Sequence, residues 1–247
     1  VVIYNSSAFR MRPDVPVVVA GVNDQAAQEH QGIIANTNCT TMDLMMAVAP
    51  LHRAAGLRSM IATSYQSVSG SGKKAMDELA RQMEKLGADR EALVNGGWED
   101  PGSEVYPRPI AWNVLPFAGS LQSEGYTDEE WKLVNESRKI LDIPDLKVEP
   151  TCVRVPVMVG HGIAASLWFD RPVSAEEAET LINDFDGVAV WSEKIPTPLD
   201  SAGLDDVLVG RIRETVGTPG GINLWAVGDN LRKGAALNAV QIAELLV

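Results

Sequence analysis

The sequence predicts a mixed fold of the α+β or α/β class, and two observations lead to this class. Segments with apolar residues at helical spacing alternate with short apolar runs that are typical of buried strands. In the second half of the chain several strand patterns follow one another closely, which favours a sheet rich in antiparallel pairs. An apolar content of 45% over 247 residues is enough for a well-buried core.

The first half of the chain contains strand, helix and loop patterns in turn. It begins with an apolar, strand-like tripeptide at 1–3, whose sheet partners must come from elsewhere. An apolar run at 40–56 predicts a helix, LRSMIATS at 57–64 predicts a buried strand, and 69–87 contains a second helix that ends at a glycine. The segment 88–118 is rich in Gly and Pro, so we expect an irregular connection that ends in a short strand.

The second half is marked by two helix-start signals. Thr127 with Glu130, and Ser174 with Glu177, have the spacing of a capping box. The strand patterns that accompany them are CVRVPVMV, IAASLWF, GVAVWS, DVLVGRIR and INLWAVG. The segment GAALNAVQIAELLV then predicts a closing amphipathic helix.

Charge and cysteine content restrict the kinds of partner. With 21 Lys and Arg against 33 Asp and Glu, the net charge of −12 disfavours nucleic acid and anionic membranes. Cys39 and Cys152 are the only cysteines, too few for a disulfide framework, which favours a reducing compartment. No charged leader opens the chain and no stretch approaches the ~18 apolar residues of a membrane span. We therefore expect a cytoplasmic protein.

Cys39 is the first candidate for chemistry. It lies where a polar loop meets the helix predicted at 40–56, and a helix N-terminus lowers the pKa of a thiol. A small buried residue in a tight loop is an equally good interpretation from position alone. A thiolate nucleophile needs an acid–base partner, and His161, between two glycines after a valine-rich strand, suits that role better than His30 or His52. From position alone, a strand-end histidine satisfied by the backbone is the stronger interpretation of His161.

Arg154 and His161 raise a question of geometry if they share a pocket. They are an odd number of positions apart, so one regular strand would point them to opposite faces. We expect a bulge or a strand end between them, at Pro156 or Gly160.

A glycine-rich segment, GSGKKA at 70–75, fits a dinucleotide-binding pattern after a strand and before a helix. The pattern is weak here, because no acidic residue clearly ends a second strand about 20 residues further on. The segment therefore does not predict the main cofactor site.

Five separated motifs carry a family resemblance. NSSAFRM, ANTNCTT, SYQSVSGSG, CVRVPVMVGH and VGDNLRKGAALNAVQIAELL occur in this order over nearly the whole chain. Together they resemble aspartate-semialdehyde dehydrogenase. The family's N-terminal glycine-rich βαβ unit has no counterpart here, so the resemblance implies three parts: the tail of a Rossmann-like NADP-binding domain at 1–38, a catalytic and dimerisation domain at 39–227 with a mixed sheet covered by helices, and a helix at 228–247 that returns to the NADP-binding domain.

The resemblance also implies an activity. It would be the NADP-dependent, phosphorylating interconversion of aspartyl phosphate and aspartate semialdehyde through a cysteine thioester, in the biosynthesis of lysine, threonine and methionine. It implies a homodimer as well. The alternatives are an enzyme similar to N-acetylglutamyl phosphate reductase, or a catalytic and dimerisation fragment that binds no cofactor and is inactive by itself.

Roles for single residues follow from the same resemblance. Cys39 matches the nucleophile, His161 the acid–base group and Gln66 the side chain that orients the substrate. The positions that match substrate and phosphate contacts are Arg10, Asn38, Glu129, Lys132 and Arg154, with Arg154 on the α-carboxylate, Glu129 near the amino group and the others on phosphate. The positions that match cofactor contacts are Ser69, Gly70 and Asn230. No metal site is implied.

The chain departs from the family pattern at three positions. Tyr4, Gly21 and Thr37 stand where the family usually has Asp, Glu and Pro. None of the three is a matched chemical group, so the departures bear on loop rigidity and on the fit of the NADP-binding domain.

Overall fold

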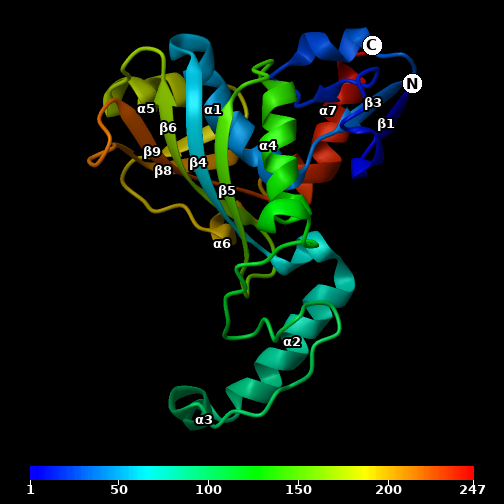
Figure 1. Ribbon diagram of the computed structural model, residues 1–247, viewed down its shortest axis with the longest axis vertical. Coiled ribbons are helices and arrows are strands. Elements are labelled where there is room, and N and C mark those ends of the chain that lie inside the picture. Colours follow the sequence, from blue (N-terminus) through cyan, green and yellow to red (C-terminus); the bar gives the residue numbers. More distant parts are fainter.

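The computed structural model describes residues 1–247 and contains one large and one small β-sheet (Figure 1). The strands of the large sheet are β4 (Leu57–Gln66), β5 (Lys147–Arg154), β6 (His161–Phe169), β7 (Val188–Trp191), β8 (Val207–Glu214) and β9 (Gly221–Gly228). Their order is β5-β4-β6-β9-β8-β7, with parallel pairing in β4–β5 and β7–β8 and antiparallel pairing in the other three pairs. The predicted fold class, with its mixed sheet rich in antiparallel pairs, is confirmed.

Helices cover one face of this sheet. They are α1 (Cys39–Ala55), α4 (Asp128–Ile140) and α5 (Ala175–Asn183), while the short α6 (Pro198–Ser201) lies in the connection from β7 to β8. Alternation along β4 shows the two faces, because Met60 and Ala62 are buried whereas Ile61 and Tyr65 are exposed. The helix-covered face therefore holds the main core, and the opposite face presents apolar side chains to the surface.

The small sheet packs at one side of the large one (Figure 1). Its strands β1 (Val2–Tyr4), β3 (Ile33–Asn36) and β2 (Val17–Val18) lie in that order and are parallel. The chain returns to it from β9 through a π-helical turn, Arg232–Leu237, into α7 (Asn238–Glu244). Ile242 of α7 packs in one cluster with apolar residues of this sheet, so the N- and C-terminal parts of the chain form one layer.

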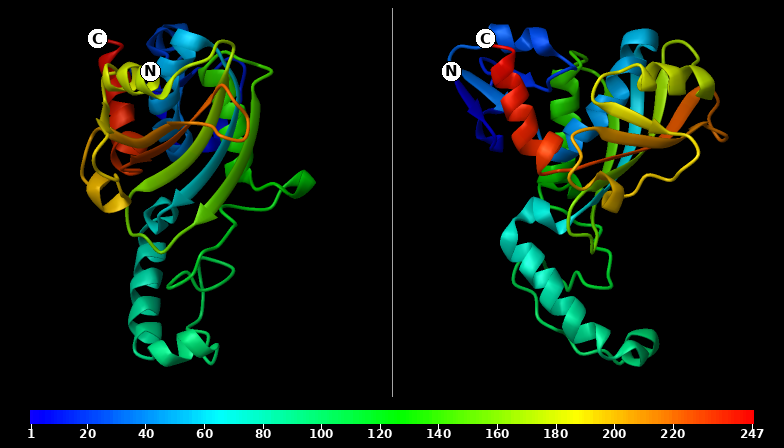
Figure 2. Two further views of the ribbon diagram at one scale, coloured as in Figure 1. Left: turned by 90° about the vertical axis from the view of Figure 1, so that its left-hand side faces the viewer. Right: turned by 180° about the vertical axis from the view of Figure 1, so that it is seen from behind.

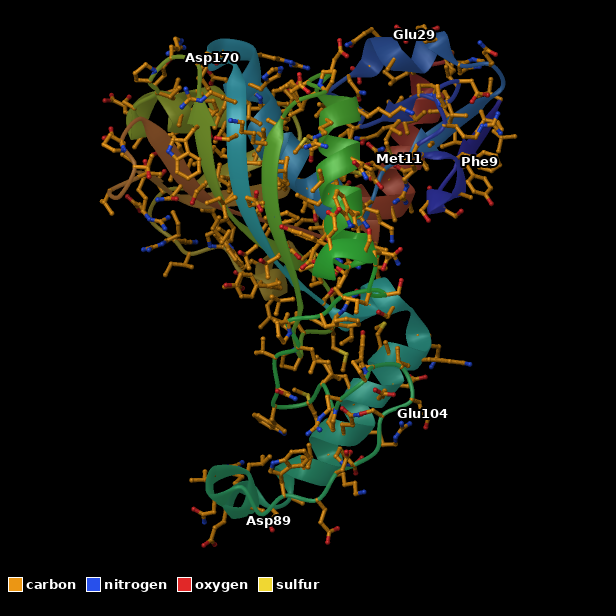
Figure 3. The ribbon with its side chains drawn as sticks, viewed as in Figure 1. Phe9, Met11, Glu29, Asp89, Glu104 and Asp170 are labelled. Atoms are coloured by element: carbon orange, nitrogen blue, oxygen red, sulfur yellow. The ribbon has the colours of Figure 1, made fainter.

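Residues 73–118 form an arm that extends away from the sheets in every view (Figures 1 and 2). Its helices are α2 (Lys73–Gly87) and α3 (Arg90–Asn95); Asp89 lies near its far end, and Glu104 lies on the strand-free segment that returns along α2 (Figure 3). Two buried side chains of α2 hold this segment. Glu78 accepts the backbone N–H groups of residues 104 and 105, and Gln82 accepts those of residues 110 and 111. The irregular connection is confirmed, but its short strand is reduced to one bridge at Leu115, and the sequence did not predict α3.

Several predicted boundaries were wrong for local reasons. The strand predicted at 152–159 ends at Arg154, because Pro156 interrupts the ladder, and extends backwards to Lys147. The closing helix begins as the π-helical turn rather than as an α-helix. Thr127 and Glu130 form the predicted capping box. Ser174 caps α5, but the Glu177 side chain pairs with Arg171 instead of closing the box.

Four short 3₁₀ helices complete the secondary structure. They are Ser7–Phe9, Asp24–Glu29, Val68–Ser71 and Ser123–Gly125. None of the helices combines the length and the apolar character that crossing a membrane requires.

Candidate active site

One cavity of about 300 Å³ lies where the large sheet meets the small one. It is lined by the C-terminal ends of β4 and β5, the first residue of β6, the start of α1, the first turns of α4, and the chain that follows β9. All eleven residues singled out from the sequence line it: Arg10, Asn38, Cys39, Gln66, Ser69, Gly70, Glu129, Lys132, Arg154, His161 and Asn230.

The start of α1 fixes the position of Cys39. Asn38 is the N-cap residue, and its Oδ1 accepts the backbone N–H groups of Thr40 and Thr41 at 3.0 and 3.3 Å. Behind the cysteine the π-helical turn comes so close that a Cβ atom on Gly234 would lie 3.0 Å from the Cβ of Cys39. The thiol is therefore held between a capped helix start and a glycine backbone, half-exposed at the cavity.

The expected low pKa of Cys39 is wrong for the structure without ligands. Burial raises the pKa of the Cys39 thiol to about 12, and the charges of Glu129 and Asp43 add to the increase. Arg154 and the backbone amide of Thr40 act in the opposite direction but do not outweigh burial. Burial raises the pKa of Cys152 to about 12 as well, so the two thiols differ in accessibility and not in acidity.

His161 is the first residue of β6 and is almost fully buried. Burial and the charge of Arg154 lower the pKa of His161 to about 3, so the ring is neutral. Its Nδ1 atom lies 3.0 Å from both the backbone nitrogen and the hydroxyl oxygen of Ser67. Gly70 lies beside the other ring nitrogen, where an added Cβ atom would be 3.2 Å from Nε2.

Arg154 and His161 reach one cavity from two different strands. Arg154 ends β5 and His161 begins β6, with Pro156 and Gly160 in the connection, and β4 lies between the two strands. The expected strand end lies between them, so no bulge is needed to bring these two oddly spaced residues to one cavity.

The Arg154 guanidinium is only partly occupied by the protein. Nη1 donates to the carbonyl oxygen of Ser67 at 2.8 Å, and the group lies 5.8 Å from the centre of the Tyr106 ring. Nε is buried without a hydrogen-bond partner, and Nη2 makes no hydrogen bond to the protein. These two neighbouring nitrogens form the fork that suits a planar carboxylate.

A polar network on α4 faces the thiol. Lys132 Nζ donates to Glu129 Oε1 at 2.6 Å and to Asp128 Oδ2 at 2.7 Å. Burial by itself lowers the pKa of Lys132, but Glu129 and Asp128 outweigh it and the net shift is upward. The other oxygen of Glu129 accepts from Asn38 at 3.1 Å and from Gln66 at 3.4 Å, which joins α1, β4 and α4 at the cavity.

Arg10 is held more firmly by the protein than the sequence suggested. Its Nε donates to the Asn36 carbonyl at 2.8 Å, Nη2 to the Asn5 carbonyl at 2.7 Å, and Nη1 to Glu136 Oε1 at 3.0 Å. Two of the five guanidinium N–H bonds remain for a ligand.

Glu136 is a site residue that sequence reasoning missed. It is 1% exposed, and its second oxygen accepts from the Thr37 hydroxyl at 2.5 Å and the Asn38 amide at 2.6 Å. It therefore ties Arg10 to the segment just before Cys39. Its position seven residues after Glu129 puts it on the same face of α4, and this spacing was the available signal.

Three further residues at the site were missed. Ser67 contacts His161. Asp43 raises the pKa of Cys39. The backbone of Gly234 packs against the Cys39 side chain. Only the tertiary contacts give them these positions.

Comparison with known proteins places this chain in a family. Residues 48–233 match the family described as "Semialdehyde dehydrogenase, dimerisation domain". The fold and the thiol site thus define the chain as one of the semialdehyde dehydrogenases. Relatives named aspartate-semialdehyde dehydrogenase are 53% identical in Streptomyces akiyoshiensis and 46% identical in Synechocystis sp., over 100% of this chain and 74% and 72% of their own lengths.

A solved structure agrees with these relatives. The aspartate semialdehyde dehydrogenase II of Vibrio cholerae, complexed with ASA, superposes with a TM-score of 0.92 at 43% identity, over 99% of this chain and 71% of its own. The chain belongs to the aspartate-semialdehyde dehydrogenase family.

Proposed function

We propose that the chain interconverts aspartyl phosphate and aspartate semialdehyde with NADP, through a thioester on Cys39. The observation that carries this proposal is the cavity itself. It combines a half-exposed thiol at a helix start, a neutral imidazole and an arginine fork without a protein partner. These are the groups that a phosphorylating aldehyde dehydrogenase needs for a substrate with a carboxylate at one end.

The substrate's two charged groups have complementary partners. Arg154 would bind the α-carboxylate through Nε and Nη2, which would satisfy its unpaired buried nitrogen. Glu129 would accept a hydrogen bond from the amino group, and Gln66 has a buried, unpartnered Oε1 to offer beside it. This arrangement would hold the reacting carbon at Cys39.

Substrate binding would also activate the thiol. Glu129 is a cause of the raised pKa of Cys39, and an ammonium group beside Glu129 would compensate its charge. The pKa of Cys39 would then fall in the complex, so that the thiolate forms where the substrate is already in place. His161 would act at the oxygen of the reacting carbon.

Phosphate would bind at the cationic edge of the cavity. Lys132 and the two remaining N–H bonds of Arg10 supply positive charge there, and both side chains are fixed by ion pairs with α4. Asn38, whose side chain already caps α1 and contacts Glu129, precedes Cys39 and lines the same cavity as these cations.

Three further residues that line the cavity fit the nicotinamide end of NADP. Ser69 and Asn230 present polar groups, and Gly70 leaves room that a side chain would fill against His161 and Arg154. When bound, NADP supplies the ring that takes up or gives hydride. Ser69, Gly70 and Asn230 would hold that ring beside the Cys39 side of the cavity.

A homodimer and a cytoplasmic role in amino-acid biosynthesis complete the proposal. The match to a dimerisation domain and the exposed apolar face of the sheet, with Ile61 and Tyr65, support self-association. The pathway to lysine, threonine and methionine rests on the family resemblance.

The half-reaction without cofactor gives the cleanest test. Aspartyl phosphate would acylate Cys39: the Cys39 sulfur bonds to the acyl carbon, the bond between that carbon and the phosphate oxygen breaks, and inorganic phosphate leaves and takes up the thiol proton. Intact mass and peptide mapping should show one aspartyl group on Cys39, and none in Cys39→Ser. Labelling by N-acetylglutamyl phosphate instead would favour the alternative enzyme, and no acylation by either would contradict the proposal. Titration with NADP then distinguishes the two remaining cases: binding supports a complete enzyme, and no binding supports a fragment that lacks a cofactor site.

A further inference from the structure

Ser67 lies directly behind the catalytic imidazole. It follows β4, whose last residue is Gln66, and it is fully buried. Its backbone nitrogen and its hydroxyl oxygen each lie 3.0 Å from Nδ1 of His161. One residue thus makes two contacts with the same ring nitrogen.

The backbone amide determines which ring nitrogen carries the proton. An amide N–H can only donate, and a neutral imidazole has one nitrogen that can accept. Nδ1 of His161 is therefore unprotonated, and the hydrogen lies on Nε2, the nitrogen beside Gly70. The low pKa of His161 is consistent with a neutral ring in this state.

The hydroxyl of Ser67 lies between the ring and Asn230. Asn230 Oδ1 accepts the backbone N–H of Gly160 at 2.9 Å, which fixes this atom as the oxygen of the amide. The Ser67 hydroxyl has one hydrogen and lies 3.0 Å from both this oxygen and Nδ1 of His161. Because Gly160 and the Ser69 hydroxyl already donate to Asn230 Oδ1, the Ser67 hydroxyl can donate its hydrogen to the unprotonated Nδ1.

Helix capping does not explain the serine at position 67. Ser67 occupies the N-cap position of the 3₁₀ turn Val68–Ser71, where a serine side chain ordinarily accepts a backbone N–H. No such bond is made here. The Ser67 hydroxyl contacts the side chains of His161, Asn230 and Ser69 instead.

We propose that Ser67 is a positioning residue for His161: its amide places the ring hydrogen on Nε2, and its hydroxyl donates a second hydrogen bond to Nδ1 that fixes the orientation of the ring. This rests on the proposed function, because it describes how His161 serves the reaction. The Nε2–H group then donates a hydrogen bond to the oxygen of the reacting carbon. Ser69 contacts both the Ser67 hydroxyl and Asn230, in the segment that returns after β9, so the ring and the proposed cofactor contacts share one hydrogen-bond network.

Other charged groups at the cavity do not replace Ser67 at Nδ1. Arg154 on β5, Glu129 and Lys132 on α4, and Arg10 line the same space, but none of them makes a hydrogen bond to the His161 ring. The protein also contains two natural references. Nδ1 of His52 accepts the amide of Leu57, and Nδ1 of His30 that of Gly32, each at 3.0 Å and each without a hydroxyl.

Nuclear magnetic resonance of the imidazole nitrogens tests the tautomer without any activity measurement. The chain has three histidines, so ¹⁵N-histidine labelling gives a small set of two-bond correlations. We expect His161 to show a hydrogen on Nε2 and an unprotonated Nδ1 near neutral pH. A hydrogen on Nδ1 would overturn the proposal.

The variant Ser67→Ala tests the hydroxyl. It keeps the amide, so the tautomer should stay, while the Nδ1 signal of His161 shifts and those of His30 and His52 do not. The rate of Cys39 acylation should fall by about tenfold, with little change in the aspartyl phosphate concentration at half-maximal rate, because the ring loses its orientation. Ser67→Thr, which keeps a hydroxyl, should restore the signal and much of the rate.

Ser137→Ala is the matched control. Ser137 is fully buried on α4, and its hydroxyl has no hydrogen-bond partner, so this variant reports the effect of losing a buried hydroxyl in general. Unchanged His161 signals and acylation rate in Ser67→Ala would refute the role of the hydroxyl. If wild-type Cys39 is not acylated at all, the proposed function fails, whereas the tautomer and the Nδ1 shift still decide the contact itself.

Discussion

Gly228, at the end of β9, lies against the carboxylate of Asp43 on α1 so closely that a Cβ atom at position 228 would be 2.5 Å from Oδ1. Asp43 is fully buried, and neither of its oxygens has a hydrogen-bond partner. The glycine thus provides the space for an acidic side chain one helical turn after Cys39. This contact joins the helix that carries Cys39 to the strand that leads to Asn230.

Gly228→Ala should lower the free energy of unfolding by about 2 kcal/mol, because the new methyl group overlaps a buried carboxylate that has little room to move. Asp43→Ala in the same chain should recover most of the loss. Urea unfolding of the two single variants and the double variant measures the coupling. Additive effects would show that the two residues do not compete for space.

Asp43→Asn should be more stable than the wild-type protein, and this difference should increase as the pH rises. Burial, with a contribution from Asp229, raises the pKa of Asp43 well above 3.8, while Lys233 acts in the opposite direction. The folded state then keeps a proton that the unfolded state loses, so the contribution of Asp43 to stability decreases as the pH rises from near 3.8 towards the folded-state pKa. Asparagine has no proton to lose, and the advantage should grow by up to about 1.4 kcal/mol per pH unit in this window.

Urea unfolding at pH 5 and pH 8 would check this pH dependence. Asp145→Asn, at an exposed position without a hydrogen bond, is the control and should show no such trend. An advantage of Asp43→Asn that is equal at both pH values would contradict a raised pKa.

Iodoacetamide should label Cys39 and spare Cys152. The pKa of each thiol is raised to about 12, so selectivity comes from access: Cys39 is half-exposed at the cavity and Cys152 is fully buried. Labelling should be slow at neutral pH and accelerate as the pH rises, because the thiolate is the reactive form. Peptide mapping checks the site, unfolded protein should label at both cysteines, and earlier labelling of Cys152 in the folded protein would reverse the assignment.

Glu136→Gln should destabilise the protein by about 3 kcal/mol, because the Arg10 charge remains buried without its partner. The exposed pair Arg12–Asp14 is the matched control, and Asp14→Asn should cause no measurable loss. Thermal unfolding compares the two. Similar small effects would mean that the buried pair contributes no more than a surface pair.

Arg154→Lys should lower the second-order rate constant of Cys39 acylation by about tenfold or more, because lysine keeps the charge but loses the fork of Nε and Nη2. Inhibition by inorganic phosphate should barely change. Arg10→Ala should do the reverse and weaken inhibition by phosphate. If Arg154→Lys instead weakens inhibition by phosphate and leaves the rate constant of acylation intact, the assignments of the two anion sites are reversed.

Much of the site could be predicted because its residues lie in local motifs. Asn38 and Cys39 stand together at a helix start, and Arg154 and His161 lie at the two ends of one connection. Glu136 had one local signal, its spacing of seven residues from Glu129 on α4. Ser67 and Gly234 could not be found in this way, since each acts on a residue that is 94 or more positions away in the chain. Contacts over such separations leave no periodic signal in one sequence.

The sequence by itself determined the elements whose causes are local: the alternation along β4, the capping box at Thr127 and the positions of the motifs. Tertiary structure alone decided the acidity of Cys39, because a helix start lowers a thiol pKa by a modest amount while burial among distant carboxylates raises it more. It also decided that residues 73–118 form an arm, since buried Glu78 and Gln82 bind a segment that has no regular pattern of its own. The arm is held by hydrogen bonds from the backbone to two side chains, and such bonds leave no periodic pattern in the sequence.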